Sequence, residues 1–160
     1  MSRDSDSEIL RQLYGRKFDV AKTLAQIDEI EKFKMESFPL KVTGKTFELL
    51  NNGFTYISGR DRLYRPVVIT RPRVFNEMPD PKPSNEEVLA ALILLQWYIR
   101  KYMMSNGRIE NVIQVMDLSG NFKIPFAVTK FALSRMPKLN RGRARTFFVV
   151  NTSSTISFLW

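Results

Sequence analysis

Two neighbouring stretches decide the fold class: SNEEVLAALILLQWYIRKYMM at residues 84–104 and VIQVM at residues 112–116. In the first, Ser84 and Glu87 form a capping box, in which each side chain satisfies a backbone donor at a helix start. The following run is apolar on most sides, so we expect a helix to about Met104, buried against a sheet and not displayed on a surface. The second stretch is apolar on both faces, as in strands that are covered on both sides.

Further elements precede this pair. Strands rich in aromatic and β-branched residues are predicted at 54–57 and 67–70, and the turn residues between them favour pairing of the two strands. Two helices are predicted before the strands. The first ends in a left-handed cap at Gly15, and the second runs from an N-cap at Asp19 to just before Pro39.

Other elements follow it. We expect a helix at 125–134, a strand at 147–150 and a further helix start near Ser153. The resulting order of helices and strands is an α/β pattern, with a small N-terminal helical lead-in and a mixed, mostly parallel sheet with flanking helices. We divide the chain into a lead-in at 1–50 and a ligand-binding domain at 51–160.

Histidine and cysteine are both absent from the sequence. Their absence excludes Ser-His-Asp and Cys-His catalysis, histidine- or cysteine-ligated zinc, and a disulfide framework. We therefore expect no enzymatic activity, no cofactor and a reducing compartment. Residues 1–8 are polar and acidic, whereas a secretory signal needs a basic start and an apolar core, so we expect a cytoplasmic protein. The apolar run at 88–99 is about 12 residues long, short of the roughly 20 that span a membrane.

The net charge of +9 is concentrated in the second half of the chain. Residues 1–87 hold 15 Lys and Arg against 14 Asp and Glu, a net of +1, and residues 88–160 hold 10 against 2, a net of +8. Such a field attracts an anionic membrane or a nucleic acid. Basic clusters lie at 60–73 and 135–145, and either could equally be a solvated surface. Because no nucleic-acid-binding signature accompanies them, the sequence argues against a nucleic-acid partner.

Two motifs that suggest catalysis have simpler interpretations. The segment GKT at 44–46 is similar to the end of a phosphate-binding loop, but Pro39 stands where the first glycine belongs, so we interpret the segment as a loop. Asp117 and Ser119 could form a carboxylate and nucleophile pair. Without histidine the serine has no evident base, and the G-x-S-x-G elbow is missing. We expect the Asp117 side chain to bind local backbone amides in a turn.

Four segments in collinear order are similar to motifs of the CRAL-TRIO family. LYGRKFDVAK at 13–22 resembles the family's L-R-A-R-K-F-D-V start and matches it residue for residue from Arg16 through Val20. GRDRLYRPV at 59–67 resembles its G-x-D-x-x-G-R-P-V turn, with Tyr64 in place of the second glycine.

The other two segments lie in the second half. VMDLSG at 115–120 resembles the family's I-x-D-x-x-G strand end. Residues 143–151 and 158–160 resemble its P-E-R…I-N-A-P…F-x-x-x-W segment, with Gly142 in place of the acid. The resemblance extends from about residue 10 to the last residue.

This resemblance implies a hydrophobic pocket over the sheet, which holds one lipid and exchanges it at membranes. In members that bind phosphatidylinositol, the pair matching Arg16 and Lys17 lies in the headgroup phosphate site, and the arginine matching Arg143 lies on the same network. Arginine forks onto phosphate oxygens and lysine adds a point charge. We expect the pocket to be lined or supported by apolar side chains with one polar contact, the set being Phe54, Tyr56, Trp97, Gln114, Met116, Phe148 and Val150.

In the family, a gating helix follows the strand that ends at Asn151, whereas this chain stops at Trp160. We therefore expect a domain truncated before the gate, whose exposed apolar wall favours dimerisation. The expected ligand is a phospholipid or phosphoinositide, and the expected location is cytoplasmic with peripheral association to an anionic membrane. The alternative hypothesis is a lipid-independent interaction module that binds an acidic partner through the basic surface at 135–145.

Overall fold

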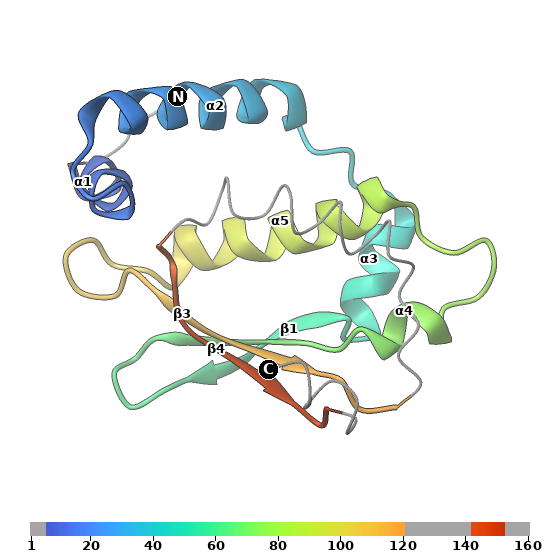
Figure 1. Ribbon diagram of the computed structural model, residues 1–160. Coiled ribbons are helices and arrows are strands. Elements are labelled where there is room, and N and C mark those ends of the chain that lie inside the picture. Colours follow the sequence, from blue (N-terminus) through green and yellow to red (C-terminus); the bar gives the residue numbers. More distant parts are fainter. Residues whose placement is uncertain (1–5, 121–141, 153–160) are drawn as a thin grey trace.

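The structure is a computed structural model that describes residues 6–120 and 142–152. Its elements, shown in Figure 1, are α1 (Asp6–Gly15), α2 (Val20–Ser37), α3 (Gly44–Asn51), β1 (Thr55–Arg60), β2 (Pro66–Thr70), α4 (Arg73–Glu77), α5 (Asn85–Tyr102), β3 (Val112–Asp117) and β4 (Ala144–Val150). This confirms the predicted α/β class, with N-terminal helices and a mixed sheet flanked by helices. The helices predicted at 125–134 and near Ser153 lie outside the described residues.

The strands form one sheet in the order β1-β2-β3-β4. β1 and β2 pair, as predicted, and their pairing is antiparallel, while β2 with β3 and β3 with β4 pair parallel. α5 is part of the crossover that parallel pairing of β2 and β3 requires. β4 begins before its predicted start at Phe147, and its pairing with β3 is irregular beside Val112 and Ile113.

The pairing register divides the side chains between two faces of the sheet. Successive side chains along a strand point to opposite faces. One cross-strand row, on what we call the packed face, therefore consists of Ile57, Val68, Gln114 and Phe147. The neighbouring row, on what we call the open face, consists of Tyr56, Ile69, Val115 and Phe148.

α5 covers the packed face (Figure 1). Its Ile99 is fully buried in a cluster with Val68 and Val112, and Ile57 and Leu95 are packed against that cluster. On its other side, α5 packs against α2. Phe33 of α2 forms a second buried cluster there with Leu89 and Ile93 of α5. Among the helices that the structure describes, none covers the open face, and the described clusters of buried residues lie on the side of α5.

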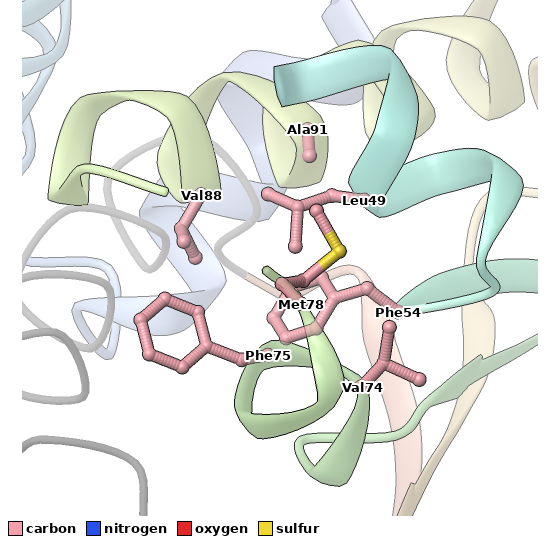
Figure 2. Packing of buried hydrophobic residues seen from close by; sticks show 7 residues of the cluster. All are labelled: Leu49, Phe54, Val74, Phe75, Met78, Val88 and Ala91. Carbon is pink, nitrogen blue, oxygen red and sulfur yellow. The ribbon is translucent and has the colours of Figure 1, made fainter. Parts of the chain in front are cut away.

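The largest described cluster of buried apolar residues closes one end of the packed face (Figure 2). It joins α3, α4 and α5 around the residue that precedes β1, and consists of Leu49, Phe54, Val74, Phe75, Met78, Val88 and Ala91. α5 begins here with the predicted capping box, in which Ser84 Oγ accepts from the Glu87 amide and the Glu87 carboxylate accepts from the Ser84 amide. The cap therefore fixes the start of the helix over this cluster.

Three local predictions are wrong. The segment at 44–46 is the first turn of α3 and not a loop, because Thr43 caps it through a hydrogen bond from the Thr46 amide. Gly15 is not a left-handed cap, since the left-handed residues of the α1–α2 turn are Lys17 and Phe18, with φ of 54° and 63°. The N-cap at Asp19 is confirmed, because its carboxylate accepts from the Lys22 amide.

The third error concerns the end of α5. The helix was expected to be buried on most sides, yet Trp97, Tyr98 and Tyr102 are all exposed there. The Lys101 ammonium lies over the rings of Trp97 and Tyr102, 4.8 Å and 5.0 Å from their centroids. A cation above an aromatic face is attracted by the negative face of the ring, so these residues form a defined cluster on the surface.

Candidate functional site

The open face carries an apolar row that crosses all four strands, with Arg71 over the Tyr56 ring at one end of it, 5.1 Å from the centroid. By strand alternation and register, Val67, Ile113 and Val150 lie on the same face as the row Tyr56, Ile69, Val115 and Phe148. Phe148 is 50% exposed, and Val150 is exposed beside it. A contiguous apolar surface of this kind marks a site for a ligand or a partner.

The structure divides the predicted pocket residues among four places. Tyr56, Phe148 and Val150 lie on the open face, and Gln114 and Met116 lie on the packed face. The remaining two lie elsewhere: Phe54 in the buried core and Trp97 on the surface of α5. The predicted set therefore does not share one surface, and its role in ligand binding stays a prediction.

The predicted headgroup residues also lie in different surroundings. Arg16 donates from Nε to Gln26 on α2, and Gln26 in turn donates to the buried Gln12 on α1. Lys17 is exposed in the turn between these two helices. Arg143, at the start of β4, is 9% exposed and turned into the protein. No described contact joins Arg143 to Arg16 or Lys17.

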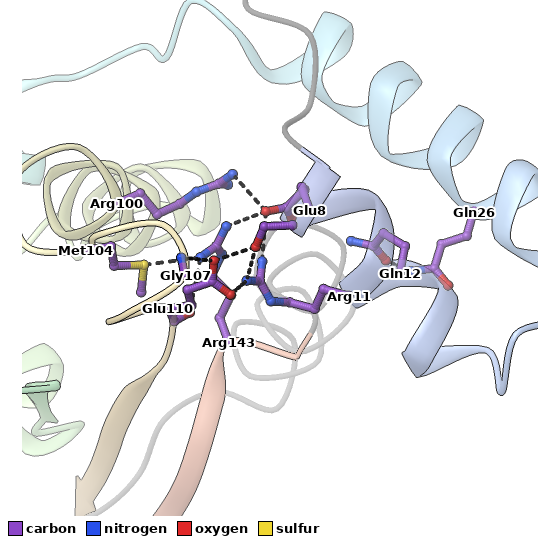
Figure 3. Close-up of polar contacts among 10 residues, drawn as sticks. Glu8, Arg11, Gln12, Gln26, Arg100, Met104, Gly107, Glu110 and Arg143 are labelled. Carbon is purple, nitrogen blue, oxygen red and sulfur yellow. Dashed lines mark hydrogen bonds and ion pairs between the residues drawn. The ribbon is translucent and has the colours of Figure 1, made fainter. Parts of the chain in front are cut away.

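Arg143 is the centre of a polar network between α1, α5 and the sheet (Figure 3). Its Nη2 donates to the Glu8 carboxylate on α1. Its Nη1 donates to the backbone oxygen of Glu110, at 3.1 Å, and to the Met104 sulfur, at 3.2 Å. The network thus joins the N-terminal helix to β4 across 135 residues of sequence.

A second acid and a second arginine complete this network. Arg11 bonds Glu8 at 2.9 Å through Nη1 and the Glu110 carboxylate at 2.7 Å through Nη2. Glu110 also accepts from the Gly107 amide at 2.9 Å and from the Ser7 hydroxyl. Arg100 Nη2 lies 3.8 Å from Glu8. Three arginines therefore face two carboxylates, which leaves the cluster with one net positive charge.

The electrostatics agree with this geometry. Burial lowers the pKa of the Arg143 guanidinium, and the neighbouring Glu8 charge opposes that shift. The pKa of Glu110 is lowered because its carboxylate accepts two hydrogen bonds. The bond from the Gly107 amide has the larger effect, and the bond from the Ser7 hydroxyl has the next largest. Hydrogen bonds to a carboxylate favour its ionised form. A buried guanidinium without a carboxylate partner would destabilise the fold. The ion pair with Glu8 offsets the desolvation of Arg143.

The turn after β3 is a structural cap, as predicted. Asp117 Oδ1 accepts from the Ser119 amide at 2.9 Å and from the Asn151 side chain at 2.7 Å. Both hydrogen bonds lower the pKa of the Asp117 carboxyl, and the bond from Asn151 has the larger effect. They tie the ends of β3 and β4 together at the edge of the open face. Within residues 6–120 and 142–152, no group of three or more acidic side chains is placed to hold a metal ion.

The model of the CRAL/TRIO domain family matches residues 50–160, well over half of the chain. The chain belongs to the CRAL/TRIO family. Membership indicates a lipophilic ligand, and the apolar open face lies inside the matched region. No curated protein matches the chain. In the part of the chain that the structure describes, no helix is both apolar and long enough to cross a bilayer.

Two departures from the CRAL/TRIO motifs now have a structural account. Tyr64, in place of the turn's second glycine, adopts φ of 61°, so it takes up the left-handed conformation that glycine would adopt freely. Gly142, in place of the acid, has φ of 65°, and a side chain there would meet Arg11 Cγ at 2.8 Å. In this chain the carboxylate that pairs with Arg143 is that of Glu8, on α1.

Sequence reasoning missed Glu8, Arg11 and Glu110 altogether. A hydrophobic or helical pattern carries no signal for a contact across more than a hundred residues. An excess of arginine near the start of β4 was visible, but its partner was not. The alternative site at 135–145 is described only in part, because Arg143 and Arg145 fall within the described residues and Arg135, Lys138 and Arg141 do not.

Proposed function

We propose that the chain binds one phospholipid or phosphoinositide with its acyl chains on the open face, and exchanges or presents it at membranes without catalysing a reaction. The observation that carries this proposal is the apolar row of Tyr56, Ile69, Val115 and Phe148, over which no described helix lies. Family membership supports the lipophilic character of the ligand.

The physical argument is the free energy of covering this face. Each methylene group buried from water contributes about 0.8 kcal/mol, so an acyl chain gains several kcal/mol from contact with an apolar sheet. Phe148 and Val150 gain as well, because a large part of each side chain is exposed without a ligand. The row is apolar across all four strands, which favours contact with a hydrocarbon chain over a polar ligand.

The basic network at the start of β4 supports an anionic headgroup at that end. Phe148 lies five residues beyond Arg143, which immediately precedes β4. At about 3.3 Å per residue this is about 16 Å, close to the thickness of one bilayer leaflet, half of the ~30 Å hydrocarbon core. A lipid with its headgroup near Arg143 would therefore extend its acyl chains past Phe148 towards Val150. We propose Arg16, Lys17 and Arg143 as the headgroup contacts.

The test of ligand binding is native mass spectrometry of the chain after incubation with phospholipid vesicles and removal of the vesicles. The proposal expects an added mass equal to one phospholipid. A clean spectrum of the free protein, from a sample shown to be folded by circular dichroism, would contradict it.

The headgroup assignment needs its own test, and Arg143 is unsuited to it because it is buried in the network that joins α1 to β4, so its loss would disturb the fold as well. We therefore choose Arg16→Gln with Lys17→Asn, since asparagine tolerates the left-handed backbone at that position. Phosphoinositide binding should fall while phosphatidylcholine binding persists. The charge-matched control is Lys32→Gln with Lys41→Gln, two exposed lysines elsewhere in the lead-in. Equal loss of both lipids in the test variant would remove the assignment.

A further inference from the structure

The turn between β1 and β2, residues 61–65, presents two large apolar side chains to solvent. We call this turn the hairpin tip. Leu63 is 65% exposed and Tyr64 is 69% exposed. They are consecutive residues in the loop that projects from the paired strands β1 and β2 (Figure 1). Leu63 and Tyr64 lie outside the strands that form the open face, so ligand binding there does not explain their exposure.

The hairpin tip is held rigidly in this shape. Asp61 Oδ1 accepts from the amides of Leu63 and Arg65, each at 2.9 Å, and Asp61 Oδ2 forms an ion pair with the Arg65 side chain at 2.6 Å. The Tyr64 amide donates to the Asp61 carbonyl, and Tyr64 itself has φ of 61°. A bulky residue is seldom left-handed, and such positions gather at functional sites.

Positive charge surrounds the hairpin tip. Arg60, Arg62 and Arg65 flank Leu63 and Tyr64, with Asp61 as the one acid of residues 60–65, so this short segment has a net charge of +2. Arg60 Nη1 donates to the Tyr64 carbonyl and, at 3.0 Å, to the Met103 carbonyl.

That second bond places the hairpin tip beside the end of α5. Lys101 lies in the last turn of this helix and raises the local net charge from +2 to +3, whereas Arg100 in the same turn faces Glu8 in the polar network. Tyr102 is exposed there and packs edge-on to Trp97 with ring centroids 6.1 Å apart. Aromatic side chains with polar atoms at one end are enriched at the membrane–water interface. The two segments therefore form one basic and aromatic end of the molecule.

We propose that the hairpin tip docks on an anionic membrane, inserting Leu63 and Tyr64 among the lipid headgroups while Arg62 and Lys101 contact lipid phosphates. The inference rests on the proposed function, because exchange requires a membrane contact, and it names the surface that makes that contact. A narrow convex tip of two apolar residues can enter a headgroup layer. A stable protein interface buries a much larger and flatter area.

Vesicle co-sedimentation tests the docking surface. The variant Leu63→Asn with Tyr64→Asn removes the apolar tip, and asparagine accepts the left-handed backbone at Tyr64. Its affinity for vesicles of phosphatidylcholine with phosphatidylserine should fall about tenfold or more. Partial burial of one large apolar side chain contributes enough free energy to change the affinity about tenfold. The control is Leu24→Gln with Met35→Gln, which removes two exposed apolar residues from α2. Equal affinity of the two variants would overturn the proposal.

A label at the tip gives a direct readout of insertion. The chain contains no cysteine, so Leu63→Cys creates a single site for an environment-sensitive dye. Its emission should shift to the blue with phosphatidylserine-containing vesicles and less with phosphatidylcholine alone, whereas the dye at Met35→Cys should not shift. No shift at position 63, or salt-sensitive binding to an acidic protein or RNA without vesicle binding, would overturn the proposal.

The docking surface and the ligand site fail separately in these experiments. The variant with both tip residues changed should retain its bound phospholipid in native mass spectrometry, because the tip is remote from the row on the open face. A wild-type protein that inserts its labelled tip but shows no bound lipid would contradict the proposed function and leave the docking surface standing. A protein that holds lipid but does not insert its tip would contradict the docking surface and leave the proposed function standing.

Discussion

The two faces of the sheet are built from the same four strands and from similar side chains, yet they have different surroundings. On the packed face, Ile57 and Val68 lie under Ile99 and Leu95 of α5. On the open face, the neighbouring residues Tyr56 and Ile69 have no described helix above them. Strands that are apolar on both faces are typical of sheets covered on both sides. In the part of the chain that the structure describes, helices cover only one side of this sheet.

The contrast is weaker at β4 than at the other strands. Phe147 points to the packed face and Phe148 to the open face, but their exposures are similar, 47% and 50%. Phe147 therefore stays exposed although it lies on the face that α5 covers. This adjacent pair has the same chemistry and exposure on opposite faces, so it offers a matched comparison for ligand binding.

The largest effect on stability should come from the network that fixes α1 beside the packed face. Glu8→Ala would leave the buried Arg143 guanidinium without its carboxylate, and we expect the free energy of unfolding to fall by about 3 kcal/mol. Urea denaturation followed by circular dichroism measures this loss. Arg143→Met added to Glu8→Ala should recover part of it. The control is Glu36→Ala, an exposed acid on α2; a Glu8 variant as stable as this control would contradict the account.

The next effect compares one residue type on the two faces. Ile99 is fully buried, so Ile99→Ala should lower the free energy of unfolding by about 2–5 kcal/mol. Ile69 lies on the open face, so Ile69→Ala should cost about 1 kcal/mol or less in the lipid-free protein. Both values come from urea titrations of protein stripped of lipid. Equal losses would mean that the open face is covered as well as the packed face.

The smallest effect is a dependence of stability on pH at the polar network. The pKa of Glu110 in the folded protein is lowered from 4.5 by the bonds from Gly107 and Ser7. Its stabilisation is thus fully present above that value and is lost as pH falls through the lower folded pKa. Glu110→Gln should flatten the fall in unfolding free energy between about pH 5 and pH 3. A slope identical to that of wild type would remove Glu110 as its source.

Local signals in the sequence predicted most of the fold. The capping box at Ser84 and Glu87 fixed the start of α5, and the paired strands β1 and β2 followed from turn residues between them. The short helix α3 was missed because it opens with Gly44, a poor helix former, and relies on the cap at Thr43. The left-handed Lys17 and Phe18 carry no compositional signal.

The candidate site was less predictable, for a physical reason. Alternation alone places Gln114 and Met116 on one face of β3, and Phe148 and Val150 on one face of β4. Whether these two faces coincide depends on the register between the strands, which a one-residue shift would reverse. The structure places them on opposite faces. The carboxylate of Glu8 beside Arg143 depends likewise on tertiary packing, because α1 reaches β4 only in the folded chain.

The most direct test of the open face as the ligand site compares Phe148→Asp with Phe147→Asp. Native mass spectrometry after incubation with phospholipid vesicles measures the fraction of each variant that carries lipid. A charge at position 148 would face the acyl chains on the open face, so we predict loss of bound lipid in Phe148→Asp and near wild-type occupancy in Phe147→Asp. Retention of lipid by Phe148→Asp, with its loss in Phe147→Asp, would place the ligand on the packed face and contradict the account.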